Sequence, residues 1–268
     1  MRSSTKLIGA CCNIGQQKLG VESAPHIMQK FYPKKKIEMI QTEGSGFYKA
    51  LFDHHNECLE NNNVITIGGD HSISLATVAS AAASFGPDLN VVWIDAHADI
   101  HTRVSSETKN VHGMPVASLL GHDNLFNFPE IKEHQLTYVG LRDVDEYEQL
   151  VLDFSTIRNY DMSYIGRHSI EKVADTLSNI DGPIHVSFDV DSIDPLEFAS
   201  TGTPVKNGLS MADVWKILGA LRDKTVSTDF VEFNPYISPQ ICEPSRDAHI
   251  LFELIEFMSD ADEERGPR

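Results

Sequence analysis

The sequence is poor in basic residues and contains no long apolar run. Its 268 residues include 22 Lys plus Arg against 39 Asp plus Glu, a net charge of −17 with histidine neutral. This balance disfavours nucleic-acid binding, which depends on lysine and arginine at the phosphates. No apolar stretch approaches the ~18 residues of a membrane-spanning helix. We therefore expect neither a nucleic acid nor a membrane as a partner.

Cysteine is also scarce. The four cysteines form no CxxC pair, and two of them are adjacent: Cys11, Cys12, Cys58 and Cys242. Four cysteines in this length are too few for a disulfide scaffold. The apolar stretch 7–12 near the start is shorter than the ~7–15 residue core of a signal peptide. Both features predict a cytoplasmic protein.

Hydrophobic residues make up 41% of the chain, enough to form a substantial core. The sequence has no internal repeat, low-complexity tract or Pro/Gly/Ser-rich linker. We therefore expect a single domain over residues 1–268. Within it, residues 259–268 are charged, end in Gly-Pro-Arg and are expected to form a flexible tail.

Short β-branched runs alternate with helical patterns. Ile170, Val173, Leu177 and Ile180 follow the spacing of one helix face, and the same pattern recurs over 250–258. This alternation predicts an α/β fold of three layers, with a mostly parallel eight-stranded sheet flanked by helices on both faces. The eight strands are expected at 6–10, 37–41, 64–68, 91–95, 136–140, 157–161, 184–189 and 229–233.

Acidic residues and histidines gather at the predicted strand ends, where ligands bind in open parallel sheets. The sequences there are GGDH at 68–71, DAHAD at 95–99 and DVD at 189–191, followed by Glu232. In an extended backbone, side chains two residues apart point the same way. Asp95, His97 and Asp99 are therefore expected to face one side.

Four converging carboxylates would repel one another. A lone DxD is commonly a turn or a cap, but that interpretation leaves the repulsion between Asp95, Asp99, Asp189 and Asp191 unexplained. Two divalent cations would balance the four charges, with His71 and His97 as neutral ligands. Oxygen-rich ligation with some imidazole suits Mn²⁺, and the lack of cysteine disfavours structural zinc. A bridging hydroxide would leave a charge of −1, which suits a cationic substrate.

Seven motifs, in order along the chain, resemble the arginase branch of the ureohydrolases. The resemblance covers residues 15–235 and implies an eight-stranded α/β sheet, two Mn²⁺ per chain, and hydrolysis of L-arginine to L-ornithine and urea. It also implies a homo-oligomer, a trimer or hexamer. The motifs are GGDHS (68–72), DAHAD (95–99), VHGMP (111–115), GLRDVDEYE (140–148), SFDVDSIDP (187–195), TGTP (201–204) and VEFNP (231–235).

The resemblance also implies roles for individual residues. His112 matches the proton shuttle, Glu232 the group that holds the guanidinium, and Asp99 is counted with them as catalytic. One Mn²⁺ would be held by His71, Asp95, Asp99 and Asp189, and the other by His97, Asp95, Asp189 and Asp191.

The far end of the substrate site departs from the family pattern. His101 stands where arginases usually have asparagine, and Thr108-Lys109-Asn110 replaces the usual Ser-Gly-Asn. We expect His101 to offer a ring N–H to the α-carboxylate. The substrate-binding set implied by the resemblance is His101, Ser106, Thr108, Asn110, Asp145, Glu148, Thr203 and Glu232, with Asp145 and Glu148 receiving the α-amino group.

Two other functions remain open. The chain can be a ureohydrolase for another guanidino compound, such as agmatine or a guanidino acid. It can also be a catalytically silent binding protein, although a silent homologue is free to lose ligands and this sequence keeps the full set. Two further histidines, His54 and His55, are expected on an exposed helix face.

Overall fold

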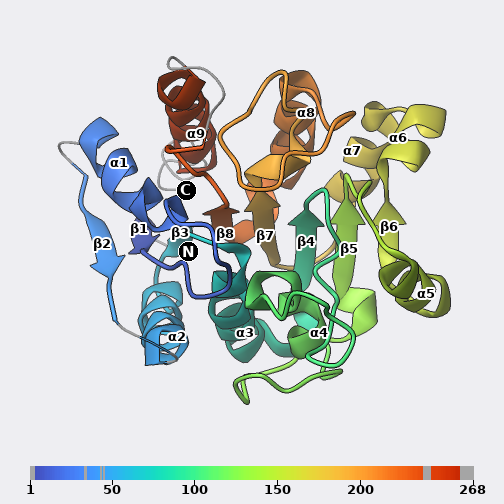
Figure 1. Cartoon of the computed structure of the whole chain (residues 1–268), viewed down its shortest axis with the longest axis horizontal. Helices are drawn as coiled ribbons and strands as arrows, with labels where there is room; N and C mark the ends of the chain where they lie inside the picture. Colours follow the sequence, from blue (N-terminus) through green and yellow to red (C-terminus); the bar gives the residue numbers. More distant parts are fainter. Residues whose placement is uncertain (1–3, 33–34, 43, 45, 238–242, 260–268) are drawn as a thin grey trace.

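The computed structural model describes residues 4–32, 35–42, 44, 46–237 and 243–259. Eight strands form one sheet in the order β2-β1-β3-β8-β7-β4-β5-β6, and every pairing between neighbours is parallel (Figure 1). The strands are β1 (Thr5–Ala10), β2 (Ile37–Ile40), β3 (Asn63–Ile67), β4 (Asn90–Ile94), β5 (Leu136–Val139), β6 (Arg158–Tyr160), β7 (Ile184–Asp189) and β8 (Thr225–Val231).

Each of the eight predicted strands is present, with one clear shift. The last strand was expected at 229–233, but it begins at Thr225 and ends at Val231. Its first half is rich in Thr and Ser, which hid it from a search for apolar runs. Glu232 then leaves the strand direction with a φ of 65°.

Helices cover both faces of the sheet, as the α/β prediction requires. Figure 1 shows α1, α6, α7, α8 and α9 along one face and α2, α3, α4 and α5 along the other. The first group is α1 (Ala24–Phe31), α6 (Met162–His168), α7 (Ile170–Ser178), α8 (Met211–Leu221) and α9 (Glu243–Ser259); the second is α2 (Gly46–Leu59), α3 (Ser74–Phe85), α4 (Pro115–Leu119) and α5 (Glu146–Phe154).

Two apolar cores lie between the sheet and these layers. Strand residues alternate between them: Ile65 and Val92 pack toward α7, α8 and α9, whereas Val64 and Val91 pack toward α2 and α3. Short 3₁₀ helices connect the elements: η1 (Val21–Ser23), η2 (His71–Ile73), η3 (Gly86–Asp88), η4 (Val111–Gly113), η5 (Glu133–Gln135), η6 (Val190–Ser192) and η7 (Arg222–Lys224).

The predicted apolar helix face is confirmed in α7, where Ile170, Val173 and Leu177 are buried. The prediction for α2 was wrong in part, because His55 is fully buried while His54 is partly exposed. Residues 260–268 of the expected tail lie outside the described residues. Among the helices that are described, none is long and apolar enough to cross a membrane.

Four neighbouring strands, β3, β8, β7 and β4, place the motifs at one edge of the sheet. Because all four strands are parallel, their carboxyl ends lie side by side at the same end of the sheet, and the four strands occupy its middle. The convergence does not come from extended backbone, as the sequence suggested. β4 ends at Ile94, so residues 95–99 form a loop, and Asp191 lies in η6.

Candidate metal centre

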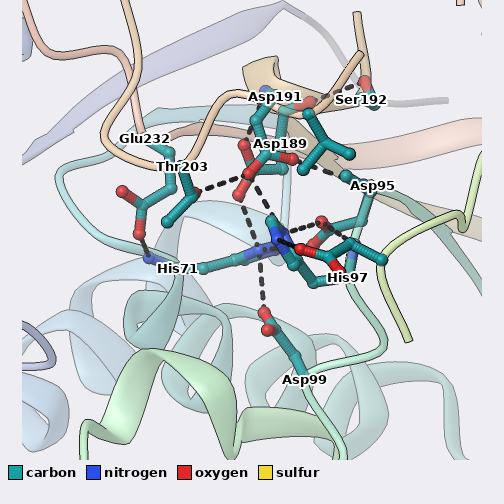
Figure 2. Close-up of polar contacts among 12 residues, drawn as sticks. His71, Asp95, His97, Asp99, Asp189, Asp191, Ser192, Thr203 and Glu232 are labelled. Carbon is teal, nitrogen blue, oxygen red and sulfur yellow. Dashed lines mark hydrogen bonds and ion pairs between the residues drawn. The ribbon is translucent and has the colours of Figure 1, made fainter. Parts of the chain in front are cut away.

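The imidazole of His71 lies at the centre of a buried acidic cluster. Its Nδ1 is 3.0 Å from Asp95 Oδ2, 3.1 Å from Asp99 Oδ2 and 3.2 Å from Asp189 Oδ2. All four side chains are buried, and Figure 2 shows them pointing toward one another. Two donors that each lie about 2.1 Å from one octahedral cation are about 3 Å apart. The spacing in this cluster therefore fits a divalent cation.

The second ring nitrogen of His71 has a polar partner of its own. His71 Nε2 is 2.9 Å from the hydroxyl of Ser187, and the ring stacks on Trp93 with 4.2 Å between centroids. If Nε2–H donates to Ser187, Nδ1 presents a lone pair toward three carboxylate oxygens. None of those three contacts has the geometry of a hydrogen bond. A cation between them would bind both the lone pair of Nδ1 and the carboxylate oxygens.

A second group of ligands shares one residue with the first. His97 Nδ1 lies 3.1 Å from Asp191 Oδ2 and 3.5 Å from Asp95 Oδ1. The two oxygens of Asp95 thus face different histidines. Asp189 directs Oδ2 toward His71, while its Oδ1 accepts the N–H of Asp191 at 2.8 Å. Two adjoining cation sites with Asp95 between them fit these side chains.

The electrostatics of the cluster favour added positive charge. Burial raises the pKa of Asp189, and the charges of Asp191 and Asp95 raise it further, well above its usual range. Burial alone would lower the pKa of His71, but its contacts with Asp189 and Asp95 outweigh burial and raise it well above the usual range. Asp189 therefore holds a proton, unless a bound cation stabilises its charged form.

The GGDH motif builds one wall of this cluster through its backbone. A Cβ on Gly69 would meet the carbonyl oxygen of Cys12 at 1.7 Å, so only glycine fits there. Asp70 points away from the cation sites. It caps η2 by accepting the N–H of Ser72 at 3.0 Å and accepts the N–H of Gly15 at 2.9 Å.

Two of the acidic residues have left-handed backbone. Asp99 has φ 50° and Glu232 φ 65°, conformations that cost non-glycine residues about 1–3 kcal/mol. Local hydrogen bonds hold them: Val116 N–H donates to the Asp99 carbonyl at 3.0 Å, and Glu232 N–H donates to the Gly69 carbonyl at 2.8 Å. Both bends turn a carboxylate toward the centre of the site.

Glu232 and His112 form a pair beside the cluster. His112 Nδ1 is 3.2 Å from Glu232 Oε1, which also accepts the backbone N–H of His71 at 2.9 Å. Gln16 Nε2 donates to Glu232 Oε2 at 2.7 Å. Burial alone would lower the pKa of His112, but the contact with Glu232 outweighs it and raises the pKa. His112 is thus poised to carry a proton.

A cavity of about 270 Å³ opens above these groups. Among the described residues, its lining contains no lysine or arginine and several carboxylates, so it suits a cationic ligand. The predicted residues that line it are His71, His97, Asp99, His101, His112, Asp145, Glu148, Asp189, Asp191, Thr203 and Glu232. Asp95 lies beneath it, fully buried.

Thr108 and Asn110 line a neighbouring cavity of about 370 Å³. His112 and Thr203 line both cavities, so the two adjoin. Ser106 lines neither of them. It is buried, and its hydroxyl accepts the N–H of Lys109 at 3.0 Å. Ser106 therefore supports this loop in the structure, and its contact with substrate stays a prediction.

The far end of the first cavity contains contacts of His101 that the sequence did not predict. His101 Nε2 is 2.8 Å from Asp145 Oδ2, and its Nδ1 is 3.0 Å from the hydroxyl of Ser105. Both ring nitrogens are engaged, so neither offers an N–H to a substrate carboxylate in this conformation. Asp145 and Glu148 form the reciprocal cap of α5, with Glu148 N–H donating to Asp145 Oδ1 at 2.9 Å.

Several residues of the site received no role from the sequence. Gln16 contacts Glu232 from 216 positions away, and Asp143 Oδ2 lies 3.4 Å from His97 Nε2. Trp93 Nε1–H donates to Asp95 Oδ2 at 2.9 Å. Arg142 donates to the carbonyl oxygens of Asp191 and other loop residues and holds that loop. Arg142 and Asp143 lie inside the GLRDVDEYE motif and Trp93 lies two positions before DAHAD, whereas no motif includes Gln16.

Comparisons with known proteins agree with this geometry. The family model described as "Arginase family" matches residues 3–255. The chain is 39% identical over 202 residues to the arginase of Neurospora crassa, an alignment that covers 69% of this chain and 56% of that protein. It is 30% identical to human "Arginase-2, mitochondrial", over 94% of this chain and 83% of that protein.

The fold comparison extends over nearly the full length. The crystal structure of the arginase from Bacillus subtilis superposes with a TM-score of 0.85 at 29% identity and covers 99% of both chains. The eight-stranded parallel sheet, the metal-ligand groups at its edge and the match over residues 3–255 lead to one conclusion. The chain belongs to the arginase family of ureohydrolases.

Proposed function

We propose that this chain hydrolyses the guanidino group of L-arginine to L-ornithine and urea with two Mn²⁺ ions. The observation that carries the proposal is the pair of ligand groups joined by Asp95, beneath an acidic cavity with Glu232 on its wall. His71, Asp95, Asp99 and Asp189 would hold one ion, and His97, Asp95, Asp189 and Asp191 the other. When bound, the ions lower the pKa of a water molecule and so supply a nucleophile near neutral pH.

The chain's own residues would orient the substrate and move the protons. Glu232 would hold the guanidinium by charge-assisted hydrogen bonds, since Gln16 and the His71 N–H already fix the direction of its carboxylate. Water adds to the guanidinium carbon, and the bond from that carbon to the nitrogen that joins it to the rest of the substrate breaks. The departing amine needs a proton, which His112 would donate from its position beside Glu232.

The acidic far end favours a second candidate substrate. Both ring nitrogens of His101 are engaged, and Asp145 and Glu148 face the cavity. This end of the cavity therefore offers no basic group to the carboxylate of a substrate. Agmatine, which carries an amine and no carboxylate, fits such an end. For arginine, the carboxylate would turn to the adjoining cavity, where Lys18, Thr108 and Asn110 lie.

A substrate panel tests these proposals. Protein loaded with Mn²⁺ should release urea from arginine, and agmatine and a guanidino acid are the comparison substrates. Chelation should abolish turnover, and Glu232→Gln should lose it while keeping the metal. Turnover of agmatine alone would transfer the proposal to the second candidate, and no urea from any of them would favour a silent binding protein.

A cytoplasmic location and a trimer or hexamer belong to the same proposal. They are implied by the family resemblance and by the scarcity of cysteine. Light scattering on the purified chain gives the oligomer size, and cell fractionation gives the compartment.

A further inference from the structure

A separate group of metal-ligating side chains lies at the edge strand β2. Glu38 comes from β2, whereas His54 and Cys58 lie four residues apart on α2 and so share one helix face. His54 Nε2 is 2.9 Å from Glu38 Oε2 and 3.8 Å from Cys58 Sγ. One ligand atom from each of the three residues lies within 4.8 Å of the other two.

These distances match a tetrahedral zinc site. With zinc–nitrogen and zinc–oxygen bonds of about 2.1 Å and a zinc–sulfur bond of about 2.3 Å, ligand nitrogen and sulfur are about 3.6 Å apart, and nitrogen and oxygen about 3.4 Å. The observed 3.8 and 2.9 Å need only a small movement of the partly exposed Glu38 side chain. A set of one thiolate, one imidazole and one carboxylate suits Zn²⁺ and is unlike the all-oxygen sets of Mg²⁺ and Ca²⁺.

The charges around the cluster are compatible with a dication. A Cys58 thiolate and the Glu38 carboxylate together balance the two positive charges. Lys6 Nζ lies 3.9 Å from Glu38 Oε1, the oxygen that faces away from the histidine contact. Oε2 therefore stays directed at His54. The His54 and Glu38 side chains are 28% and 31% exposed, so an ion can reach them from solvent.

We propose that Glu38, His54 and Cys58 bind one Zn²⁺ that ties the edge strand β2 to α2. Binding forms a zinc–sulfur bond and releases the thiol proton of Cys58 to solvent, and a water completes the fourth position. This site is independent of the proposed function. Two strand spacings, about 10 Å across the sheet, separate β2 from β3, the nearest strand that positions the catalytic cluster, and none of the three residues is among the six proposed ligands of that cluster.

Cobalt absorption provides a direct test, because Co²⁺ bound to a thiolate absorbs in the near-ultraviolet. The protein is first loaded with Mn²⁺ and then titrated with Co²⁺. We expect the thiolate band to grow to one equivalent per chain and to disappear when Zn²⁺ displaces Co²⁺. The six proposed catalytic ligands carry no sulfur, so cobalt exchange at that centre does not produce the band.

Variants decide whether the band belongs to this site. Cys58→Ser should remove it, while the control Cys11→Ser, at a cysteine directly after β1, should keep it. His54→Gln and Glu38→Gln change partly exposed side chains and should weaken Co²⁺ binding about 10-fold or more. Urea release should be unchanged in all four variants.

Three results would overturn the proposal. The first is the absence of a thiolate band in the wild-type protein. The second is a band that survives Cys58→Ser, which would assign it to another cysteine. The third is Co²⁺ affinity unchanged in His54→Gln, which would leave His54 and Glu38 as a plain ion pair.

Discussion

Two buried clusters of histidine and aspartate are linked by a series of hydrogen bonds. They differ in how far hydrogen-bond donors balance their carboxylates. In the first, the Nδ1 of His71 faces three carboxylates. The chain continues from His71 through the hydroxyls of Ser187 and Ser74, 2.9 Å apart, to Asp229 Oδ2 at 3.0 Å. In this second cluster a single carboxylate is surrounded by donors, with Thr77 at 2.5 Å and His185 Nε2 at 3.1 Å.

The two clusters differ in the ratio of carboxylates to hydrogen-bond donors. Burial alone would raise the pKa of Asp229, but the charge and hydrogen bond of His185 outweigh it and lower the pKa. Asp189, which faces other carboxylates, has its pKa raised. The Asp229 cluster has donors enough for Asp229 Oδ2, whereas the His71 cluster would need added cations to balance its carboxylates. We therefore expect the same residue types to serve structure in one place and metal binding in the other.

The largest expected effect comes from removing one carboxylate of the His71 cluster. Asp189→Asn should lose one or both metals and nearly all activity, because a neutral amide cannot bridge two cations as a carboxylate does. Metal analysis together with urea release measures both. Asp153→Asn is the matched control, since Asp153 is an exposed carboxylate on α5, and it should keep both metals. Full metal content with near-normal kcat in Asp189→Asn would remove Asp189 from its proposed role.

A smaller loss should follow at His112, beside the cluster. His112→Asn should retain both metals and lower kcat by roughly 10²–10⁴-fold, the range for loss of general acid–base help. Steady-state kinetics and metal analysis on the same preparation separate this effect from that of Asp189→Asn. An unchanged kcat would make the contact between His112 and Glu232 structural.

Substitutions in the second cluster should lower the stability of the protein and have much less effect on its turnover. Asp229→Asn replaces the common acceptor of Ser74, Thr77 and His185 and should lower the free energy of unfolding by about 2–4 kcal/mol. Ser74→Ala removes one donor and should cost about 1 kcal/mol. Denaturant unfolding of the metal-loaded proteins measures both. Loss of metal without loss of stability in Asp229→Asn would assign this cluster to the metal centre.

Local patterns in the sequence were enough for much of the fold. Short β-branched runs located all eight strands, and several of these runs are apolar on consecutive positions, because central strands are buried on both faces. They missed the start of β8, where the sheet accommodates Thr225 and Ser227. The buried position of His55 was also missed, because its partner Ser80 lies 25 residues away on α3.

The site was predictable to a similar depth. The grouping of the motifs followed from parallel strands ending at one edge, and the structure brings all six proposed ligands together there. It brings them together through a loop and a 3₁₀ helix, which the two-residue spacing did not anticipate. The pairing of His101 with Asp145 depends on side-chain positions 44 residues apart and has no local signature. Motifs identify chemistry, whereas tertiary contacts decide which hydrogen bonds remain for a substrate.

An effect smaller than that of Asp229→Asn concerns the acid stability of the second cluster. His55 is fully buried next to it, and burial lowers its pKa to about 3 from an ordinary value near 6.5. A histidine with a lowered folded-state pKa adds stability above pH 6.5 that is lost as the pH falls toward 3. His55→Gln removes this titration and can still hydrogen-bond to Ser80.

The stability gap between wild type and His55→Gln should therefore shrink by about 2 kcal/mol between pH 7 and pH 5. Denaturant unfolding at a series of pH values measures the gap, and the metal centre contributes equally to both proteins and cancels. His122→Gln, at an exposed histidine, controls for the loss of a histidine elsewhere. Parallel curves for wild type and His55→Gln would mean that the pKa of His55 is the same in the folded and unfolded states, and burial would then not lower it.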